Sequence, residues 1–265
     1  KQKTAYEMLR SLVGSEMCIR DRITGGANGI GLATSLLFNK LGAKVIVLDN
    51  AKNFNALKKK FKKDQTSIDL YNVDVSKIKE IKAKIKVLES KYKKIDILVL
   101  NAGICPFKEF LRIDEKIFDK VINTNQKGAF FLAQEVSKIM IKKKTEGKIV
   151  FLSSISSIFG GSLQSHYCAS KGAINQIMKS MAISLGKYKI NVNAVLPGTV
   201  ITSLNKKQFI KDDKLRKYFI RRTPLNRLIS PDEIAKAILF LSSEMSSGVN
   251  GECLVVDGGM TINLQ

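Results

Sequence analysis

The segment TGGANGIG, at positions 24–31, carries four glycines, of which Gly25, Gly29 and Gly31 have the spacing GxxxGxG, directly before a pattern of helical periodicity. Gly25 permits a tight turn, Gly29 lets the backbone approach a pyrophosphate, and Gly31 allows a helix to pack closely on a strand. Glycine turns also occur without ligands, so this segment alone predicts only a strand–turn–helix unit that could bind a nucleotide.

A second feature supports nucleotide binding. Eighteen residues after Gly31, the apolar run at 44–48 ends at Asp49. An acid at the end of the second strand can bind both hydroxyls of an adenosine ribose and would repel a 2′-phosphate. The glycine turn and Asp49 together indicate a dinucleotide cofactor and favour NAD over NADP.

Strand-like and helix-like patterns alternate from position 23 to the end of this 265-residue chain. Short apolar runs lie at 44–48, 95–100, 148–152, 192–196 and 253–256, and helix-like segments lie at 33–41, 78–92, 119–142 and 169–186. Repeated β–α units imply a parallel sheet with helices on both faces. We therefore expect one α/β domain, a doubly wound, Rossmann-like parallel sheet. The polar, basic segment at 203–222 predicts a helical flap near the C-terminus.

Tyr167 and Lys171 are four residues apart, which places both side chains on one face of a helix. A free tyrosine has a pKa of about 10, so it needs help to act as a base near neutrality, and a neighbouring ammonium stabilises the phenolate. Ser154 follows the apolar run at 148–152, where the active-site residues of open α/β sheets gather. These three residues predict a catalytic group.

These features, in this order and at this spacing, resemble the short-chain dehydrogenase/reductase family over essentially all of positions 23–265. The matching motifs are the glycine turn, Asp74-Val75, Asn101-Ala102-Gly103, Asn125, Ser154, Tyr167, Lys171 and Pro197-Gly198. The resemblance implies that Tyr167 is the general acid/base and that Ser154 holds the substrate oxygen. It also implies that Lys171 binds the nicotinamide ribose and lowers the tyrosine pKa, and that Asn125 anchors a proton-relay water.

The same resemblance implies a set of cofactor-binding residues that extends beyond the glycine turn. These are Gly25, Asn28, Gly29, Ile30, Gly31, Asp49, Asp74, Val75, Asn101, Ala102, Gly103, Tyr167, Lys171, Pro197, Gly198, Val200 and Thr202.

A narrower set of segments is similar to the L-rhamnose 1-dehydrogenase group within this family. They lie at 101–107, 153–156, 160–161, 164–167, 193–199 and 263–265. This similarity implies that Ser156 and Gln164 contact sugar hydroxyls beside Ser154 and Tyr167. Neutral hydrogen-bonding side chains are what a polyol substrate needs. The alternative is that Ser156 and Gln164 only satisfy backbone groups in a loop.

We therefore expect an oxidoreductase that transfers a hydride from C1 of L-rhamnose or a similar neutral sugar to NAD, which yields the lactone. The alternative within the family is a 3-oxoacyl-thioester (acyl-carrier-protein) reductase, which shares the segments at 223–228 and 256–259. The family usually assembles as homotetramers through long helices, here at 119–142 and 169–186. A third hypothesis, from a different class, is a module that senses nucleotide or binds nucleic acid.

The net charge of +22 is the feature that favours nucleic-acid binding. However, Ile78, Ile81, Ile85 and Leu88 form one helical stripe, and the lysines of that segment fall outside it. We therefore expect solvated lysines and no nucleic-acid partner. No apolar run approaches the roughly 18 residues that a membrane span needs.

The four cysteines lie far apart, with no CxxC motif, and His166 is the single histidine. These residues predict neither a disulfide nor a metal site, and they favour a reducing, cytoplasmic compartment. Since His166 points to a different helix face from Tyr167, we expect it to be structural.

The first 22 residues do not fit the pattern of the remaining chain. The segment at 11–22, SLVGSEMCIRDR, resembles the in-frame translation of a sequencing-library adapter. We therefore interpret 1–22 as a non-native leader and 23–265 as the NAD-binding domain. Arg20, Asp21 and Arg22 then occupy the strand before the glycine turn, which should be buried on both faces. We expect these charges to reduce stability.

Overall fold

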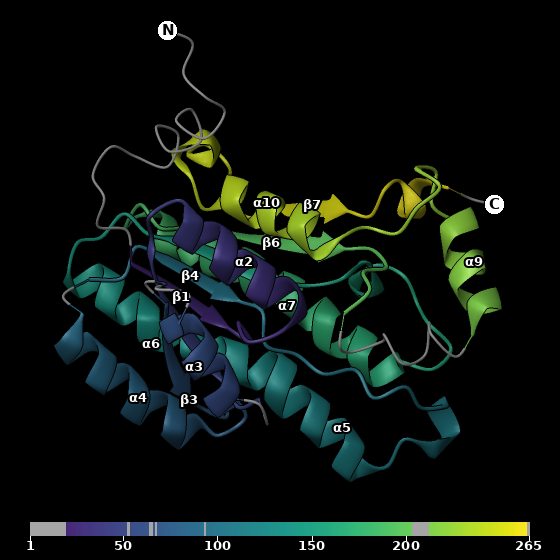
Figure 1. Ribbon diagram of the computed structural model, residues 1–265, viewed down its shortest axis with the longest axis horizontal. Coiled ribbons are helices and arrows are strands. Elements are labelled where there is room, and N and C mark those ends of the chain that lie inside the picture. Colours follow the sequence, from purple (N-terminus) through teal and green to yellow (C-terminus); the bar gives the residue numbers. More distant parts are fainter. Residues whose placement is uncertain are drawn as a thin grey trace, which may run out of the picture.

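The computed structural model describes residues 20–51, 54–63, 66, 68–92, 94–202 and 212–263. Its centre is a seven-stranded parallel sheet with the order β3-β2-β1-β4-β5-β6-β7 (Figure 1). The strands are β1 Arg20–Thr24, β2 Lys44–Asp49, β3 Ile68–Asn72, β4 Ile97–Leu100, β5 Lys148–Leu152, β6 Asn191–Pro197 and β7 Cys253–Val256. The predicted doubly wound α/β fold is confirmed.

Helices cover both faces of this sheet (Figure 1). One face packs against α2 Gly29–Lys40, α3 Phe54–Lys63 and α10 Pro231–Leu241. The other packs against α4 Ile78–Lys91, α6 Ala129–Lys142 and α7 Ser165–Gly186. Within the described part of the chain, the other helices are α5 Glu115–Val121, α9 Asp213–Arg221, the π-helix η2 Ile122–Gly128 and the short 3₁₀ segments η1 Phe110–Arg112, η3 Ile155–Ser157, η4 Glu244–Ser246 and η5 Met260–Ile262.

The strands form the middle of two apolar clusters, one on each face of the sheet. All four residues of β4 are buried, which explains why this strand reads as a continuous apolar run rather than an alternating one. Burial of each such side chain stabilises the fold by about 1.5–3 kcal/mol. The carboxyl ends of these strands are thereby held in one rigid row.

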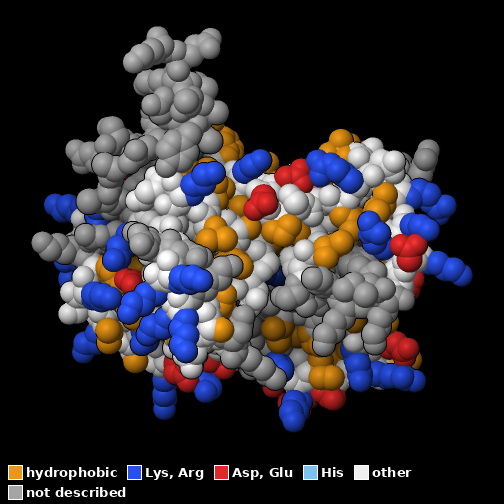
Figure 2. All heavy atoms as spheres, viewed as in Figure 1, with side chains coloured by type: hydrophobic (Ala, Val, Ile, Leu, Met, Phe, Trp, Pro, Cys, Tyr) orange, Lys and Arg blue, Asp and Glu red, His pale blue; other side chains and the backbone are white. Residues whose placement is uncertain are grey.

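The lysines of α4 lie outside the buried face of the helix, as the periodicity of the sequence predicts. Ile81, Ile85 and Leu88 are buried, whereas Lys79 and Lys82 are exposed. Lys and Arg side chains are spread over the face shown in Figure 2 and lie mostly toward its edges, with acidic side chains among them. Among the described helices, none has the length and apolar character that crossing a membrane requires.

Several boundaries differ from the sequence prediction. The segment at 119–142 is not one α-helix, because the π-helix η2 separates α5 from α6. The helices predicted at 33–41 and 169–186 begin earlier, at Gly29 and Ser165. The predicted flap at 203–222 contains α9, while 203–211 lies outside the described residues. Strand β3 and helices α3 and α10 were not predicted.

Strand β1 is hydrogen-bonded on both sides, to β2 and to β4. In register, Arg20 is opposite Lys44, Arg22 is opposite Ile46, and Asp21 lies beside Ile97. A central strand of a parallel sheet that is covered on both faces needs apolar residues in both of its rows. The sequence of β1 therefore conflicts with its position.

Replacing Arg20, Asp21 and Arg22 together with valine should raise the melting temperature by roughly 5–10 °C, because a central parallel strand favours apolar residues and the exchange of charged for apolar residues at such positions commonly stabilises a protein by about 1–4 kcal/mol. Differential scanning calorimetry measures the change. The matched control replaces Lys79, Lys82 and Lys86 of α4 with glutamine and removes three exposed charges. Equal melting temperatures for the valine variant and the wild type would contradict the hypothesis.

Candidate active site

A cavity of about 680 Å³ lies at the carboxyl ends of the strands, where ligands bind in open α/β sheets. Residues that follow β1, β2, β3, β4, β5 and β6 contribute to its lining. Leu215 and Phe219 of α9 also line it, which places the helical part of the predicted flap beside the cavity.

The cavity brings together most of the residues that the sequence predicted. The predicted residues in its lining are Gly25, Asn28, Gly29, Ile30, Asp49, Asp74, Val75, Asn101, Ala102, Gly103, Ser154, Ser156, Gln164, Tyr167, Lys171, Pro197, Gly198, Val200 and Thr202. Gly31 and Asn125 do not line it. Asn125 binds the backbone of the lining residue Ile104 from behind, and Gly31 leaves room for the carbonyl of the lining residue Gly25.

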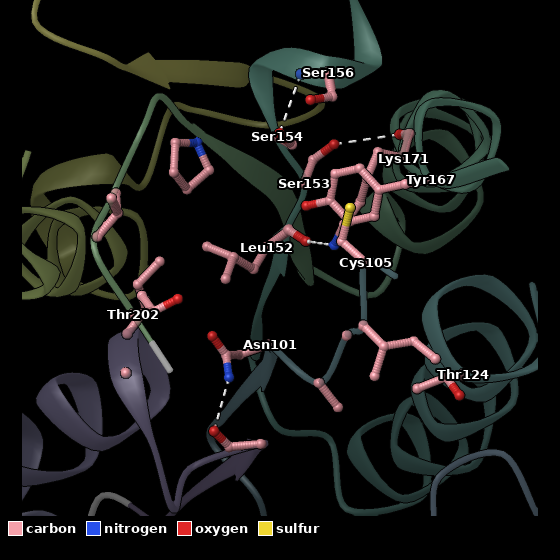
Figure 3. Close-up of a pocket in the computed structure, with 18 of the residues that line it drawn as sticks. Asn101, Cys105, Thr124, Leu152, Ser153, Ser154, Ser156, Tyr167, Lys171 and Thr202 are labelled. Carbon is pink, nitrogen blue, oxygen red and sulfur yellow. Dashed lines mark hydrogen bonds between the residues drawn. The ribbon is translucent and has the colours of Figure 1, made fainter. Parts of the chain in front are cut away.

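The glycine turn is held against the segment that follows β4. Gly25 and Gly29 adopt left-handed backbone conformations, with φ of 62° and 51°. A Cβ on Gly31 would lie 2.1 Å from the carbonyl oxygen of Gly25, so only glycine fits there. The Nδ2 of Asn101 donates to the same Gly25 carbonyl at 2.9 Å (Figure 3). The turn is therefore fixed in position before any ligand binds.

Asp49 stabilises the turn from the other side. One carboxylate oxygen accepts from the backbone N–H of Ala27 at 2.9 Å, and the other accepts from the N–H of Ala51 at 2.8 Å. Asp74 likewise accepts from the N–H and the hydroxyl of Ser76, at 2.9 and 2.7 Å. The two acids thus shape the loops after β2 and β3 at one end of the cavity.

Asn125 lies in the π-helix η2 and is 2% exposed. Its Oδ1 accepts from the N–H of Ile104 at 2.8 Å, and its Nδ2 donates to the carbonyl of Ile104 at 2.9 Å and to Ser170 at 3.1 Å. The side chain therefore joins the loop after β4 to helix α7. Its role in a proton relay stays a prediction.

Tyr167 and Lys171 occupy one face of α7, as predicted. Lys171 Nζ lies 5.6 Å from the centre of the Tyr167 ring and donates to the carbonyl of Leu152 at 2.6 Å (Figure 3). Ser153 Oγ donates to the carbonyl of Lys171 at 3.2 Å. These bonds place the end of β5, with Ser154, beside the tyrosine.

Burial is the main electrostatic influence on this pair. Lys171 is 4% exposed, and its burial lowers the pKa of the ammonium to about 8. Burial raises the pKa of Tyr167, while a hydrogen bond with Ser154 acts in the opposite direction. Ser154 is thus the group that favours the phenolate in this arrangement.

Ser156 and Gln164 lie at the same end of the cavity. The backbone N–H of Ser156 donates to Ser154 Oγ at 3.1 Å, and Gln164 Nε2 donates to Ser156 Oγ at 3.1 Å. The arrangement offers neutral hydrogen-bonding groups next to a tyrosine and a lysine. It can position an alcohol or carbonyl oxygen and exchange a proton with it.

The family model described as enoyl-(acyl carrier protein) reductase matches residues 25–261, which include the turn, the tyrosine and the lysine. The chain belongs to the short-chain dehydrogenase/reductase family. It is accordingly an oxidoreductase that acts on CH–OH groups with NAD(P).

Among curated relatives, L-rhamnose-1-dehydrogenase of Scheffersomyces stipitis is 39% identical over 248 residues, which cover 92% of this chain and 96% of that protein. The 3-oxoacyl-[acyl-carrier-protein] reductase FabG of Thermotoga maritima is 40% identical over 241 residues, or 91% of this chain and 96% of that one. A solved gluconate 5-dehydrogenase of Burkholderia cenocepacia, in complex with NADP and tartrate, is 31% identical, with a TM-score of 0.86 and coverage of 92% and 95%.

The residues present fit the dinucleotide of this dehydrogenase/reductase family. Gly25 and Gly29 present backbone without side chains at the start of α2, which suits a pyrophosphate. A Cβ on Gly103 would lie 3.6 Å from Lys171 Nζ and would take up space beside this lysine. No cluster of metal-ligating side chains exists among the described residues, and a function without a metal stays a prediction.

Sequence reasoning missed several lining residues, among them Cys105, Phe107, Ser153 and Leu163, and the α9 residues Leu215 and Phe219. Cys105, Phe107 and Ser153 lie within the segments at 101–107 and 153–156, but a single residue of these types does not indicate a site, so only position in space identifies all six as lining residues. His166 is 1% exposed and does not line the cavity, in agreement with the structural role that we expected. Among the described residues, Cys105, Cys168 and Cys253 are free thiols.

The buried ammonium of Lys171 predicts a specific pH dependence of stability. A solvated lysine has a pKa of 10.5 and Lys171 in the fold has a pKa of about 8, so the unfolded chain binds more protons between these values. The free energy of unfolding of the wild type should therefore rise relative to Lys171→Met by about 3 kcal/mol from pH 8 to pH 10.5. Urea denaturation at several pH values measures it. Lys82→Met on exposed α4 should show no such trend, and a pH-independent difference for Lys171→Met would refute the assignment.

Proposed function

We propose that this enzyme oxidises C1 of L-rhamnose or a similar neutral sugar, with NAD as the acceptor, and releases the sugar lactone. The observation that carries the proposal is the joint position of Ser154, Ser156, Gln164 and Tyr167 at one end of the cavity. These side chains offer neutral donors and acceptors, which suit the hydroxyls of a polyol. The identity to a curated L-rhamnose-1-dehydrogenase over 92% of the chain supports the same substrate class.

In this proposal Tyr167 removes the proton from the anomeric hydroxyl. Ser154 donates a hydrogen bond to that oxygen, and its bond to Tyr167 favours the phenolate. Lys171 binds the nicotinamide ribose and contributes positive charge beside the tyrosine, while Asn125 anchors the water through which the proton leaves. A nicotinamide cofactor held at this position would supply the acceptor for the hydride that leaves C1. Ser156 and Gln164 orient the ring, and such positioning contributes much of the rate.

The cofactor site follows the same logic. The backbone of the turn, with Gly25, Asn28, Gly29 and Ile30, would receive the pyrophosphate, and Gly31 behind it would allow the close approach of helix and turn. Asp74 and Val75 would flank the adenine. The nicotinamide end would be held by Asn101, Ala102, Gly103, Pro197, Gly198, Val200 and Thr202, whose lining positions support these assignments.

The alternative substrate is a 3-oxoacyl thioester, which the enzyme would reduce with the same Ser154, Tyr167 and Lys171. The 40% identity to FabG of Thermotoga maritima supports this alternative. The two candidate substrates would use the substrate end of the cavity differently. A sugar offers ring hydroxyls to Ser156 and Gln164, whereas the acyl chain of a thioester has no such hydroxyls.

Wild-type enzyme with NAD should form NADH rapidly with L-rhamnose, tested beside L-lyxose, L-mannose, D-glucose and a 3-hydroxyacyl thioester. Tyr167→Phe should lower kcat/KM by at least about a hundredfold, because it removes the general base. Tyr188→Phe, an exposed tyrosine past the end of α7, is the matched control and should retain activity. If the enzyme turns over the thioester and forms no NADH with any of the sugars, the proposed sugar oxidation is wrong and the 3-oxoacyl-thioester reductase takes its place.

The preference for NAD depends on Asp49. Its carboxylate lines the cavity at the end of β2, where a 2′-phosphate would meet negative charge. Asp49→Asn keeps the size and one acceptor oxygen, so the ratio of kcat/KM for NADP to that for NAD should rise by at least about tenfold. Steady-state kinetics with both cofactors measures the ratio. An unchanged ratio would show that Asp49 does not set the preference.

We further propose a homotetramer in a cytoplasmic setting. Large apolar side chains are exposed on the helices after β4 and β5, including Phe118 at 43%, Phe130 at 38% and Ile183 at 83%. Apolar surface of this kind marks contacts with other chains. A second copy on these helices would cover it.

A further inference from the structure

Cys105 is a buried thiol at the substrate end of the cavity, and the proposed reaction gives it no task. It is 7% exposed and lies next to Tyr167 (Figure 3). Its Sγ is 3.8 Å from Oε1 of Gln164, within the distance of an S–H···O hydrogen bond. The thiol therefore contacts Gln164, one of the two residues that are proposed to bind the sugar hydroxyls.

The backbone on both sides of this contact is fixed. Asn125 binds both the N–H and the carbonyl of Ile104, the residue before Cys105. Three residues after Cys105, the N–H of Lys108 donates to the carbonyl of Leu163 at 2.8 Å, directly before Gln164. The two segments are thus held side by side, and the contact does not depend on a flexible loop.

The Gln164 amide is confined on its other side by Gly161. A Cβ on Gly161 would lie 2.3 Å from Nε2 of Gln164, so the glycine leaves only enough room for the amide. With Oε1 at the thiol and Nε2 at Ser156 Oγ, each end of the amide has one partner. A reversed amide would place two donors together at the thiol.

The direction of the amide decides what Ser156 can offer a ligand. In the observed orientation Ser156 Oγ accepts from Gln164, so its own proton is available to an oxygen in the cavity. In the reversed orientation Ser156 would donate to the amide oxygen and present only an acceptor. Burial raises the pKa of Cys105 to about 12, so the thiol remains a protonated donor at neutral pH and opposes the reversal.

We propose that Cys105 is a positioning residue for substrate specificity, whose S–H group orients the Gln164 amide so that Ser156 presents a hydrogen-bond donor to the sugar. This inference rests on the proposed function. It adds a residue that acts through Gln164 and Ser156 and does not itself touch the reacting atoms.

The first test needs no substrate. Subtracting the infrared spectrum of Cys105→Ala from that of the wild type isolates the S–H stretching band of Cys105. In the wild type this band should lie at lower frequency than in Gln164→Ala, where the acceptor is absent. The difference spectrum with Cys253→Ala, a partly buried thiol of β7 outside the cavity lining, provides a control band that Gln164→Ala leaves in place. A Cys105 band that does not shift overturns the proposal.

The second test is kinetic. Cys105→Ala should raise KM for L-rhamnose about three- to tenfold, the effect of losing one net hydrogen bond, with kcat and the KM for NAD changed less than about twofold. Cys105→Ser keeps a donor and should restore KM, and Cys253→Ala should match the wild type. In a Gln164→Ala background, Cys105→Ala should add no further increase, because its effect passes through that amide. An additive increase, or no increase in the single variant, overturns the proposal.

The two tests separate this inference from the proposed function. If the wild type oxidises no sugar, the proposed function fails, and the S–H band alone decides whether Cys105 positions Gln164. If L-rhamnose is oxidised and Cys105→Ala leaves its KM unchanged, the function stands and the inference fails. A lower melting temperature for Cys105→Ala combined with equal losses for every substrate and cofactor would show a structural role only and also overturn it.

Discussion

The hydrogen bond from Lys171 to the carbonyl of Leu152 fixes the relation between helix α7 and the end of strand β5. Tyr167 lies one turn before this lysine, and Ser154 lies two residues after this carbonyl. The bond from Ser153 to the carbonyl of Lys171 adds a second link between the same two elements. Sliding of α7 along the sheet would break both hydrogen bonds, so the distance between Tyr167 and Ser154 is fixed. The bond to Leu152 requires the Lys171 ammonium to be buried, and this burial lowers the pKa of the lysine.

The strand order explains why the cofactor and the substrate share one cavity. The chain runs outward from β1 to β2 and β3, and then returns to place β4 on the other side of β1. The loops after β1 and β4 therefore diverge, and a crevice opens between them. Asn101 closes the base of this crevice through its bond to Gly25. The glycine turn then faces the cofactor side, while the loop with Cys105 reaches the substrate side.

The sequence predicted the fold and most of the site because both depend on local patterns. Fully buried strands such as β4 read as apolar runs, and the tyrosine and lysine of the site are one helical turn apart. Strand β3 was not predicted, because it is an edge strand in which Asp69 and Tyr71 interrupt the apolar residues. Helix α3 was missed since lysines fill much of it. The contact of Cys105 with Gln164 joins residues 59 positions apart, and no periodicity encodes it.

The π-helix η2 has a consequence for the outer surface of the molecule. In an uninterrupted α-helix, Phe118 and Phe130 would point about 120° apart, because successive side chains turn by about 100°. A π-bulge accommodates one additional residue, which removes about 100° and brings the two directions to within about 20° of each other. Both rings are partly exposed, at 43% and 38%. The same irregularity that contains Asn125 behind the cavity therefore also changes the direction in which the exposed ring of Phe118 points relative to that of Phe130 on the outer surface of α5 and α6.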